Sequence, residues 1–554
     1  MSWAKNLNIQ ITGYTYNLED GKIVREKLSK DYIFTENISE YTIRTKFAFS
    51  SVKVGSVVEY KYTKRVASYH PGNYVFQRSI PVQYSRCRIV IPEYFVFNRE
   101  IRGFVFPEVK IKTINQTATY NGQTISYNAE ELTAEIKDLP ALKDDEYVWN
   151  YREFLCRINF ELKSISKIFY KNFAQTLKQI VKSLNEDKGF GKAFKDRKIL
   201  KDELATTLVD KSTDVDSIGA ILNLVRSKIK YNGYNTIWAM GIGKALKDGS
   251  GSSGEVNGVL LNALKNAGFD AYPAVLSTRS NGRIPFTHPS INSLNYFIVC
   301  VHSGDNVYYL DATRPYTDIS IIPIDCLVEE ALIIYPNSFD WIDLTRIGNN
   351  IDKISMIVKF NEEGFLSGQK RETYFGEFAY VFKQDYDKAE DQDKYVELLE
   401  AHNDITISGY TMEEKPTLTE TYDFIDRRVR LEENDIISFS PLLFFAMRNN
   451  AFKSETRDLP VEFSFPYEQR IYVTIVLPEG YVVDELPTEG RFVFNKDQID
   501  CSYYIQAFAN NIQLSYNTKL SKCIIPAVEY GGLRDFWAKM YNKENELVVI
   551  RKAN

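Results

Sequence analysis

Histidine and paired cysteines are scarce in this chain of 554 residues. It has no Cys-x-x-Cys pair and no cluster of neighbouring histidines, and structural zinc sites are usually built from such groups. We therefore expect no metal site and no cofactor. The scattered cysteines are typical of small buried apolar groups and leave the redox compartment undetermined. The four histidines are His70, His288, His302 and His402, and the six cysteines are Cys87, Cys156, Cys300, Cys326, Cys501 and Cys523.

Blocks of like charge and long apolar runs are also missing. Lys and Arg number 68 against 73 for Asp and Glu, a net charge of -5, so nucleic acid is not an expected partner. No apolar run reaches the roughly 18 residues that a membrane-spanning helix requires. The N-terminus has no basic region followed by an apolar core. These absences predict a soluble chain with no transmembrane segment and no visible signal peptide.

What the sequence does contain is the composition of a large globular protein. The hydrophobic fraction is 44% and the charged fraction 25%, and single cores stop growing near roughly 250 to 300 residues. Short alternating runs predict an N-terminal β-sandwich at residues 1–145. A change of period predicts an α+β domain at 146–335. Alternation then returns, predicting a β-rich domain or extension of the N-terminal sandwich at 336–455 and a C-terminal β-domain with a terminal helix at 456–554.

The expected helices lie in the second of these segments. Apolar residues recur at intervals of three and four from Ile165 to Leu184 and from Ile218 to Ile229, which predicts two amphipathic helices. A third helix is expected over residues 253–267. Ser252 and Glu255 have the spacing of a capping box at its start, and Gly268 follows its end. Strands are expected near 271–277, 296–302 and 307–311.

Two motifs in this segment resemble the transglutaminase-like superfamily. They are Gly251-Ser-Ser-Gly-Glu-Val-Asn-Gly, which opens the third helix before Ala267-Gly-Phe269, and Leu310-Asp-Ala-Thr313. The resemblance implies a papain/transglutaminase-like α+β fold with a Cys, His, Asp triad. At the matching positions this chain has Ser253, Tyr296 and Asp311. Cys and His are thus replaced in a multidomain α+β protein with an N-terminal β-sandwich and one or two C-terminal β-sandwich units.

The two replacements remove the chemistry that the resemblance implies. A cysteine at a helix N-terminus beside an imidazolium is largely thiolate, whereas a serine hydroxyl needs a base and a tyrosine phenol, with a pKa near roughly 10, supplies none. We expect no catalytic residue. The leading hypothesis is a non-catalytic protein that binds a peptide or protein segment in the degenerate groove. The groove candidates are Trp238, Ser252, Ser253, His288, Asn295, Tyr296 and Asp311.

Other interpretations stay open at this point. Ser252 and Ser253 can be capping residues, and Asp311 can satisfy turn amides. A residual hydrolase could use Ser253 with Asp311 and His288, and Cys300 with His302 on one strand face invites a Cys–His reading. A third hypothesis is glycan binding, since aromatic residues make up 14% of the chain with 37 Tyr. The oligomeric state is undetermined.

The resemblance continues outside the triad region. Tyr14-Thr-Tyr-Asn-Leu-Glu-Asp-Gly-Lys22 and Phe76-Gln-Arg-Ser-Ile-Pro81 resemble the β-domain that precedes the transglutaminase-like domain in bacterial envelope proteins. Leu477-Pro-Glu-Gly-Tyr481 and Tyr530-Gly-Gly-Leu-Arg-Asp-Phe536 resemble its C-terminal companion. The resemblance implies a periplasmic or cell-envelope location, with the chain a mature or trimmed form.

Overall fold

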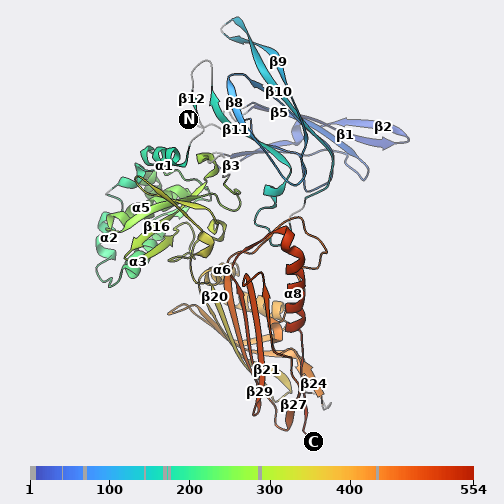
Figure 1. The fold of residues 1–554 in the computed structure, drawn as a ribbon, viewed down its shortest axis with the longest axis vertical. Coiled ribbons are helices and arrows are strands. Elements are labelled where there is room, and N and C mark those ends of the chain that lie inside the picture. The colour runs from blue at the N-terminus through green and yellow to red at the C-terminus, as the bar shows by residue number, and fades with distance from the viewer. Residues whose placement is uncertain are drawn as a thin grey trace.

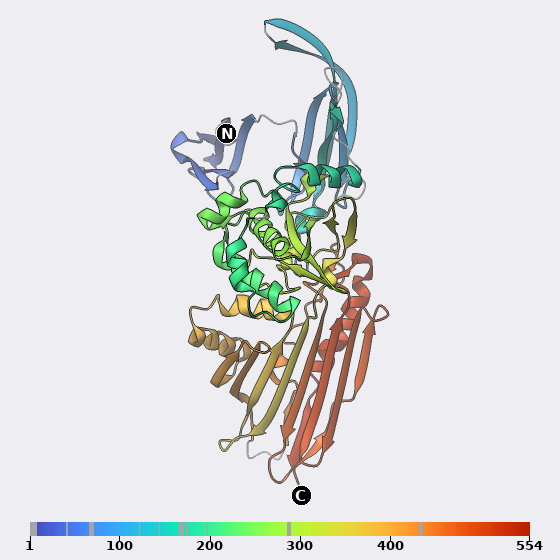
Figure 2. The ribbon, with the colours of Figure 1, turned by 90° about the vertical axis from the view of Figure 1, so that its left-hand side faces the viewer.

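The protein is an elongated stack of three parts, seen in a computed structural model. A β-rich N-terminal part lies above a mixed part with most of the helices, and a large C-terminal sheet lies below both (Figures 1 and 2). The structure describes residues 8–39, 42–65, 71–120, 122–142, 145–165, 171–172, 176–196, 198–284, 290–431 and 436–553. This confirms the predicted α+β multidomain class.

The N-terminal part is built from antiparallel strands. Its main core joins two sheets, because apolar side chains of β7, β10 and β11 pack into one cluster that includes Cys87, Leu132 and Phe160. The strands of these two sheets are β7 (Val82–Pro92), β10 (Gln123–Leu139) and β9 (Glu108–Tyr120), then β12 (Lys171–Asn172), β11 (Arg157–Ile165), β6 (Tyr74–Val75) and β8 (Phe95–Arg102). The smaller sheets are β2 (Lys22–Lys27), β1 (Asn8–Glu19) and β5 (Val57–Arg65), and β3 (Ile33–Ser39) with β4 (Thr42–Phe47).

The central part packs helices on one face of a five-stranded antiparallel sheet (Figure 1). Its helices are α1 (Leu177–Glu186), α2 (Lys201–Thr207), α3 (Asp214–Lys228), α4 (Ile242–Asp248) and α5 (Ser253–Asn266). The sheet order is β17 (Asn306–Leu310), β16 (Tyr296–Ser303), β15 (Asp270–Leu276), β18 (Ala331–Ile334) and β19 (Phe339–Ile342). A short parallel pair, β13 (Lys230–Tyr231) and β14 (Ser250–Gly251), leads into α5.

Helix α5 is the centre of this part, and its predicted start and end are confirmed. Ser252 is the N-cap of a complete capping box with Glu255, and Gly268 follows the helix with a positive φ of 94°. Eleven of its residues are buried, as expected for a helix that is covered on every side. The prediction of a helix from Ile165 is wrong at its start. Ile165 ends β11, where alternating burial indicates a strand, and α1 begins only at Leu177.

Strand β16 separates two cores because its side chains alternate between the faces of the sheet. Phe297, Val299 and Val301 pack against α5 in one cluster. Tyr296, Ile298 and Cys300 pack in another, which includes residues of the C-terminal part such as Phe465. Tyr296, which the sequence resemblance aligns with a catalytic histidine, therefore lies on the face of the sheet opposite α5.

The C-terminal part contains an eight-stranded sheet with a long helix, α8 (Tyr530–Glu544), across one face (Figures 1 and 2). The sheet order is β22 (Thr406–Glu413), β23 (Thr419–Arg430), β21 (Phe365–Tyr374), β20 (Ile351–Phe360), β26 (Tyr467–Val476), β30 (Asn511–Leu520), β29 (Ile499–Phe508) and β28 (Gly490–Phe494). The remaining elements are α6 (Glu377–Tyr386), α7 (Gln392–Asn403), β24 (Ile436–Phe439), β32 (Val548–Lys552), β27 (Tyr481–Glu485), β25 (Val461–Glu462) and β31 (Ile524–Ile525).

The predicted domain boundaries remain predictions, and two strand pairs cross them. Strand β11 follows residue 145 but pairs with β8 of the N-terminal part. The eight-stranded sheet takes strands from both sides of residue 455, since β20 pairs in parallel with β26. None of the helices in the described ranges combines the length and apolar character of a membrane span.

Candidate functional site

Ser253, which the sequence resemblance aligns with a cysteine nucleophile, is buried, and its hydroxyl both donates and accepts a hydrogen bond. Its hydroxyl donates to the carbonyl oxygen of Thr236 at 2.9 Å and accepts the main-chain N–H of Thr236 at 2.9 Å. The side chain is 0% exposed. Since a hydroxyl has one hydrogen to donate, this pairing leaves none for a catalytic base.

The main chain around Ser253 is occupied as well. The N–H of Ser253 donates to the carbonyl of Tyr234 at 3.0 Å, so the group that would stabilise an oxyanion in a thiol enzyme of this kind is already bonded. Gly254 allows this close approach. A Cβ at Gly254 would lie 2.4 Å from the carbonyl oxygen of Trp238. The segment from Tyr234 to Trp238 thus closes over the first turn of α5.

Tyr296 and Asp311, the other two triad positions, are brought together in a buried cluster. The Tyr296 hydroxyl donates to Asp311 Oδ2 at 2.8 Å and lies 2.7 Å from Thr313 Oγ1. Asn257 Nδ2 donates to the same Oδ2 at 2.8 Å, and the Thr313 N–H donates to Oδ1 at 2.8 Å. Asn257 lies one turn after Ser253 on α5, on the same helix face. The cluster therefore ties α5 to the ends of β16 and β17.

The Tyr296 phenol is protonated in this cluster. Burial, and next the charge of Asp311, raise the pKa of Tyr296 well above 10. The phenol thus keeps its proton at neutral pH and donates a hydrogen bond to Asp311. A phenol in this form is a hydrogen-bond donor and not a base. The three residues that the sequence resemblance aligns with a triad are thus a bonded hydroxyl, a donor phenol and a carboxylate that accepts hydrogen bonds.

The other predicted groove residues have structural contacts or lie outside the described residues. The Ser252 hydroxyl accepts the N–H of Glu255 in the capping box. Asn295 holds Thr278 through two hydrogen bonds, of 2.9 and 3.0 Å. Trp238 is partly buried against the α5 core, and its main-chain N–H donates to Thr236 Oγ1. His288 lies outside the described residues.

Cys300 and His302 do lie close together on β16, as their alternate positions predict. The Cys300 Sγ is 3.7 Å from His302 Nε2. Cys300 is fully buried, however, and burial raises its pKa to about 12. A thiol in this state is neither thiolate nor reachable by a substrate. This pair is therefore not a cysteine-protease dyad.

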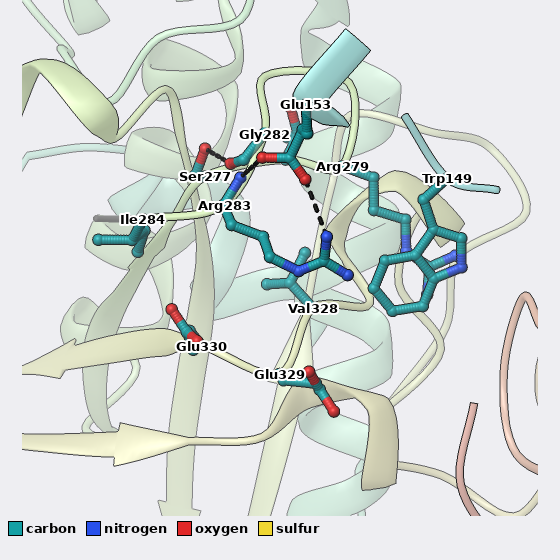
Figure 3. A pocket seen from close by; sticks show the side chains of 11 residues that line it. Trp149, Glu153, Ser277, Arg279, Gly282, Arg283, Ile284, Val328, Glu329 and Glu330 are labelled. Atoms are coloured by element: carbon teal, nitrogen blue, oxygen red, sulfur yellow. Dashed lines mark hydrogen bonds and ion pairs between the residues drawn. The ribbon is translucent and has the colours of Figure 1, made fainter. Parts of the chain in front are cut away.

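A pocket open to solvent lies after the end of β15, and we call it the Trp149 pocket. Strand β15 ends at Leu276, which pairs with Tyr296, and the next residues of the chain line the pocket. Its volume is about 400 Å³, including space open to solvent. The lining residues are Trp149, Glu153, Ser277, Thr278, Arg279, Gly282, Arg283, Ile284, Val328, Glu329 and Glu330 (Figure 3).

The N-terminal, central and C-terminal parts of the chain meet at this pocket, and contacts of Arg279 and Arg283 join them. Arg279 is buried with its guanidinium 3.6 Å from the Trp149 ring centre, and it donates to the carbonyls of Leu327 and Ser464. Arg283 pairs with Glu153 at 3.0 Å and with the buried Glu462. Burial lowers the pKa of Arg279 to about 10. Burial also opposes the charge of Arg283, but Glu462 and Glu153 outweigh it and raise that pKa.

Two carboxylates of the pocket, Glu329 and Glu330, have raised pKa values although the charge of Arg283 acts on both and lowers them. Glu329 and Glu330 lie across the pocket from Glu153 (Figure 3). Glu330 Oε2 is buried without a hydrogen bond. Burial, and then the neighbouring Glu329, raise the pKa of Glu330 to about 7, and burial with Asp343 raises that of Glu329. Carboxylates with perturbed pKa values in a pocket mark a candidate ligand site.

Sequence reasoning missed Asn257 and the whole Trp149 pocket. Asn257 had a visible signal, since it is a polar residue inside the apolar stretch of α5, where a buried amide needs partners. The pocket had none. Trp149, Arg279 and Glu462 are more than a hundred residues apart in sequence, and no local pattern connects them.

Among the comparisons with known proteins, one solved structure supports the overall fold. Residues 434–550 match the family model DUF3858, a domain of unknown function with a solved structure. No curated protein sequence matches the chain. A crystal structure described as a "putative protease" from Parabacteroides distasonis aligns with 99% of this chain and 90% of its own, at a TM-score of 0.58 and 13% identity. This chain therefore shares that overall fold.

A second solved structure is much less similar. It is described as a "putative cysteine protease" from Cytophaga hutchinsonii and aligns with 44% of this chain and 75% of its own. The TM-score is 0.18 and the identity 8%, which is too low to indicate a common fold.

Proposed function

We propose that this protein is a non-catalytic member of the protease-like fold that binds a peptide or protein segment at the Trp149 pocket, beside its degenerate triad. The observation that carries the proposal is the closed state of Ser253. Its hydroxyl and its N–H are both bonded to the segment that covers α5, and Tyr296, aligned with the catalytic histidine, donates a hydrogen bond to Asp311. Ser253, in the first turn of α5, is thus bonded to the covering segment and is not available for acyl transfer.

The Trp149 pocket supports binding in place of catalysis. It is open to solvent, it has an aromatic ring and charged groups, and its lining begins at Ser277, directly after Leu276 at the end of β15. Ligand pockets in proteins combine apolar walls with a few convergent polar groups. Because the pocket is open to solvent, a longer peptide can reach it with one side chain or chain end. Location in the cell envelope, predicted from the sequence resemblance, is part of this proposal.

Two experiments test the proposal. The first measures hydrolysis of a fluorogenic casein substrate and labelling by a fluorophosphonate, which reacts with activated serines. We expect neither in the wild-type protein, with Ser253→Ala and the exposed Ser250→Ala as matched variants. Fluorophosphonate labelling that Ser253→Ala abolishes and Ser250→Ala preserves would overturn the non-catalytic reading.

The second experiment measures binding. A random dodecapeptide library is selected on the immobilised protein, and the enriched peptides are measured by fluorescence anisotropy. We expect saturable binding that Trp149→Ala weakens, because the ring forms one wall of the pocket. Failure to enrich any peptide, or binding that Trp149→Ala leaves unchanged in a folded protein, contradicts the proposed site.

A further inference from the structure

We infer that the solvent-facing side of the eight-stranded sheet carries a glycan-binding groove, which takes a neutral oligosaccharide across Tyr472 and Tyr504. We call it the Tyr472 groove. It lies on β26, β30 and β29 of the C-terminal sheet, and it shares no lining residue with the Trp149 pocket. The inference therefore goes beyond the proposed peptide binding and does not rest on it.

The first step of the argument is the exposure of the two tyrosines. Strands β26, β30 and β29 alternate in burial, because one set of side chains packs into the core with α8 and the other set faces solvent. Tyr472 is 50% exposed and Tyr504 is 49% exposed, whereas Tyr503 and Tyr516 on the opposite face are buried. Single exposed aromatic residues are ordinary on protein surfaces, so the argument depends on how these two lie relative to each other.

The second step is the register of the strands. Ser515 on β30 is the pairing partner of Tyr472 on β26 and also of Tyr504 on β29. The three residues therefore form one row across the sheet, with the small serine between the two tyrosines, and a pocket open to solvent lies at this row. Neighbouring strands are about 4.8 Å apart, so the main chains that hold the two rings are about 10 Å apart. A ligand that covers both rings has to be longer than one sugar unit.

The third step is the set of hydrogen-bonding groups beside the rings. The next row on the same face contains Thr474, Gln513 and Gln506, and all three line the groove. Gln506 Nε2 donates to Gln513 Oε1 at 3.4 Å, a bond that uses neither the Gln513 amide nitrogen nor the Gln506 amide oxygen. Amides and hydroxyls both donate and accept, as sugar hydroxyls do. This row can therefore bond sugar hydroxyls in both directions.

The fourth step is the charge of the groove. Among the described residues that line it, Glu489 alone carries a charge. Arg470 and Arg491, on the same face of the sheet, are paired with Glu468 and Asp500, each at 2.6 Å. Since these two cations already have carboxylate partners, the groove favours a neutral glycan over an acidic one.

The last step decides between a glycan and a proline-rich peptide, which also binds aromatic grooves. The Glu489 carboxylate accepts hydrogen bonds. Sugar hydroxyls can donate to it, whereas a run of prolines has no N–H and offers only carbonyl acceptors. The face of an aromatic ring is partly negative, so the C–H bonds of a pyranose ring pack against it favourably. An oligosaccharide thus matches both the rings and the polar row.

The experiment measures binding to the full chain by isothermal titration calorimetry. The probes are the neutral trisaccharides cellotriose, maltotriose and N-acetylated chitotriose, with glucose and decaproline for comparison. The variants are Tyr472→Ala, Tyr504→Ala and Tyr472→Phe. Tyr84→Ala is the matched control, because Tyr84 is also 50% exposed but lies on β7 of the N-terminal part. A thermal unfolding curve for each variant confirms folding.

We expect at least one trisaccharide to bind the wild type and Tyr84→Ala equally. Tyr472→Ala and Tyr504→Ala should each weaken it by about fivefold or more, the range for the loss of one aromatic contact. Tyr472→Phe keeps the ring and should retain most of the affinity, and glucose should bind more weakly than the trisaccharide. The inference is overturned if none of the trisaccharides binds, if Tyr472→Ala leaves the affinity unchanged, or if glucose binds as tightly as the trisaccharide.

Decaproline decides the alternative. If decaproline binds in a manner that depends on Tyr472 and no trisaccharide does, the groove is a peptide site and the glycan inference is wrong. The proposed function is judged separately, because its test depends on Trp149 and not on Tyr472 or Tyr504. Either claim can therefore fail while the other stands.

Discussion

Replacing Ser253 by alanine distinguishes a structural serine from a catalytic one through stability alone. Serine nucleophiles lie in strained, exposed positions, and their removal commonly leaves a protein as stable or more stable. Ser253 has the opposite environment, because it is buried and both of its hydrogen bonds go to Thr236. We therefore expect Ser253→Ala to destabilise the central part of the protein.

The magnitude follows from the groups that lose a partner. The substitution removes two hydrogen bonds, each worth about 1 kcal/mol net, and leaves the N–H and C=O of Thr236 without that partner. The free energy of unfolding should fall by about 2 kcal/mol or more. For a domain of roughly 150–250 residues this corresponds to a thermal midpoint lower by about 4–8 °C.

The assay must report on the central part, since a chain with several domains does not unfold in one step. Hydrogen exchange of the α5 amides measures local opening there, and differential scanning calorimetry gives the shifted transition. Ser250→Ala is the control, because Ser250 is exposed and should change stability by less than about 0.5 kcal/mol. An unchanged or raised transition in Ser253→Ala would refute the closed-site interpretation.

Three further predictions concern the buried acids and the Tyr296 cluster. Tyr296→Phe removes one of the donors to Asp311 and should lower the unfolding free energy by about 1–3 kcal/mol, measured in urea; no change would show the bond to be dispensable. Burial, and then the charge of Glu372, raise the pKa of Asp352 from 3.8 to about 9, so the native state keeps a proton that the unfolded state loses. The unfolding free energy should then fall as pH rises between those values. Asp352→Asn should reduce that slope by about 1.4 kcal/mol per pH unit. An equal slope in both proteins contradicts the role assigned to Asp352. Burial, and then the charge of Glu329, raise the pKa of Glu330 from its ordinary 4.5 to about 7. The unfolding free energy should therefore also fall as pH rises between those values, and urea unfolding at several pH values should show that Glu330→Gln removes this part of the slope; an equal slope in both proteins contradicts it.

Local signals made helix α5 predictable. The capping box of Ser252 with Glu255 and the glycine at position 268 are both encoded within a few residues, and the structure contains both. The same kind of reasoning failed at Ile165. Apolar residues around Ile165 fit a helical spacing by chance. The conformation is determined by strand pairing with β8, about sixty residues earlier in the chain.

The resemblance pointed to Ser253, Tyr296 and Asp311, and it remains a prediction that these positions form a site. The structure does bring Tyr296 and Asp311 into contact. The resemblance could not show that the Thr236 main chain closes over Ser253, because that contact depends on the path of a loop. Nor could it show the pairing of Glu462 with Arg283, two residues that belong to different parts of the fold.

A carboxylate at the position of Asp311 can orient a base or fasten the elements around it, and the neighbouring residue decides which. An imidazole donates one N–H to the carboxylate and keeps a second nitrogen free to accept a proton. The Tyr296 phenol has one hydroxyl, and its hydrogen goes to Asp311. Tyr296 therefore offers no base, and the Ser253 hydroxyl is paired with Thr236. The pairing of Ser253 with Thr236 and the presence of a tyrosine at position 296 are therefore consistent with each other. Opening the first turn of α5 would require the segment from Tyr234 to Trp238 to move as well as two side chains to change.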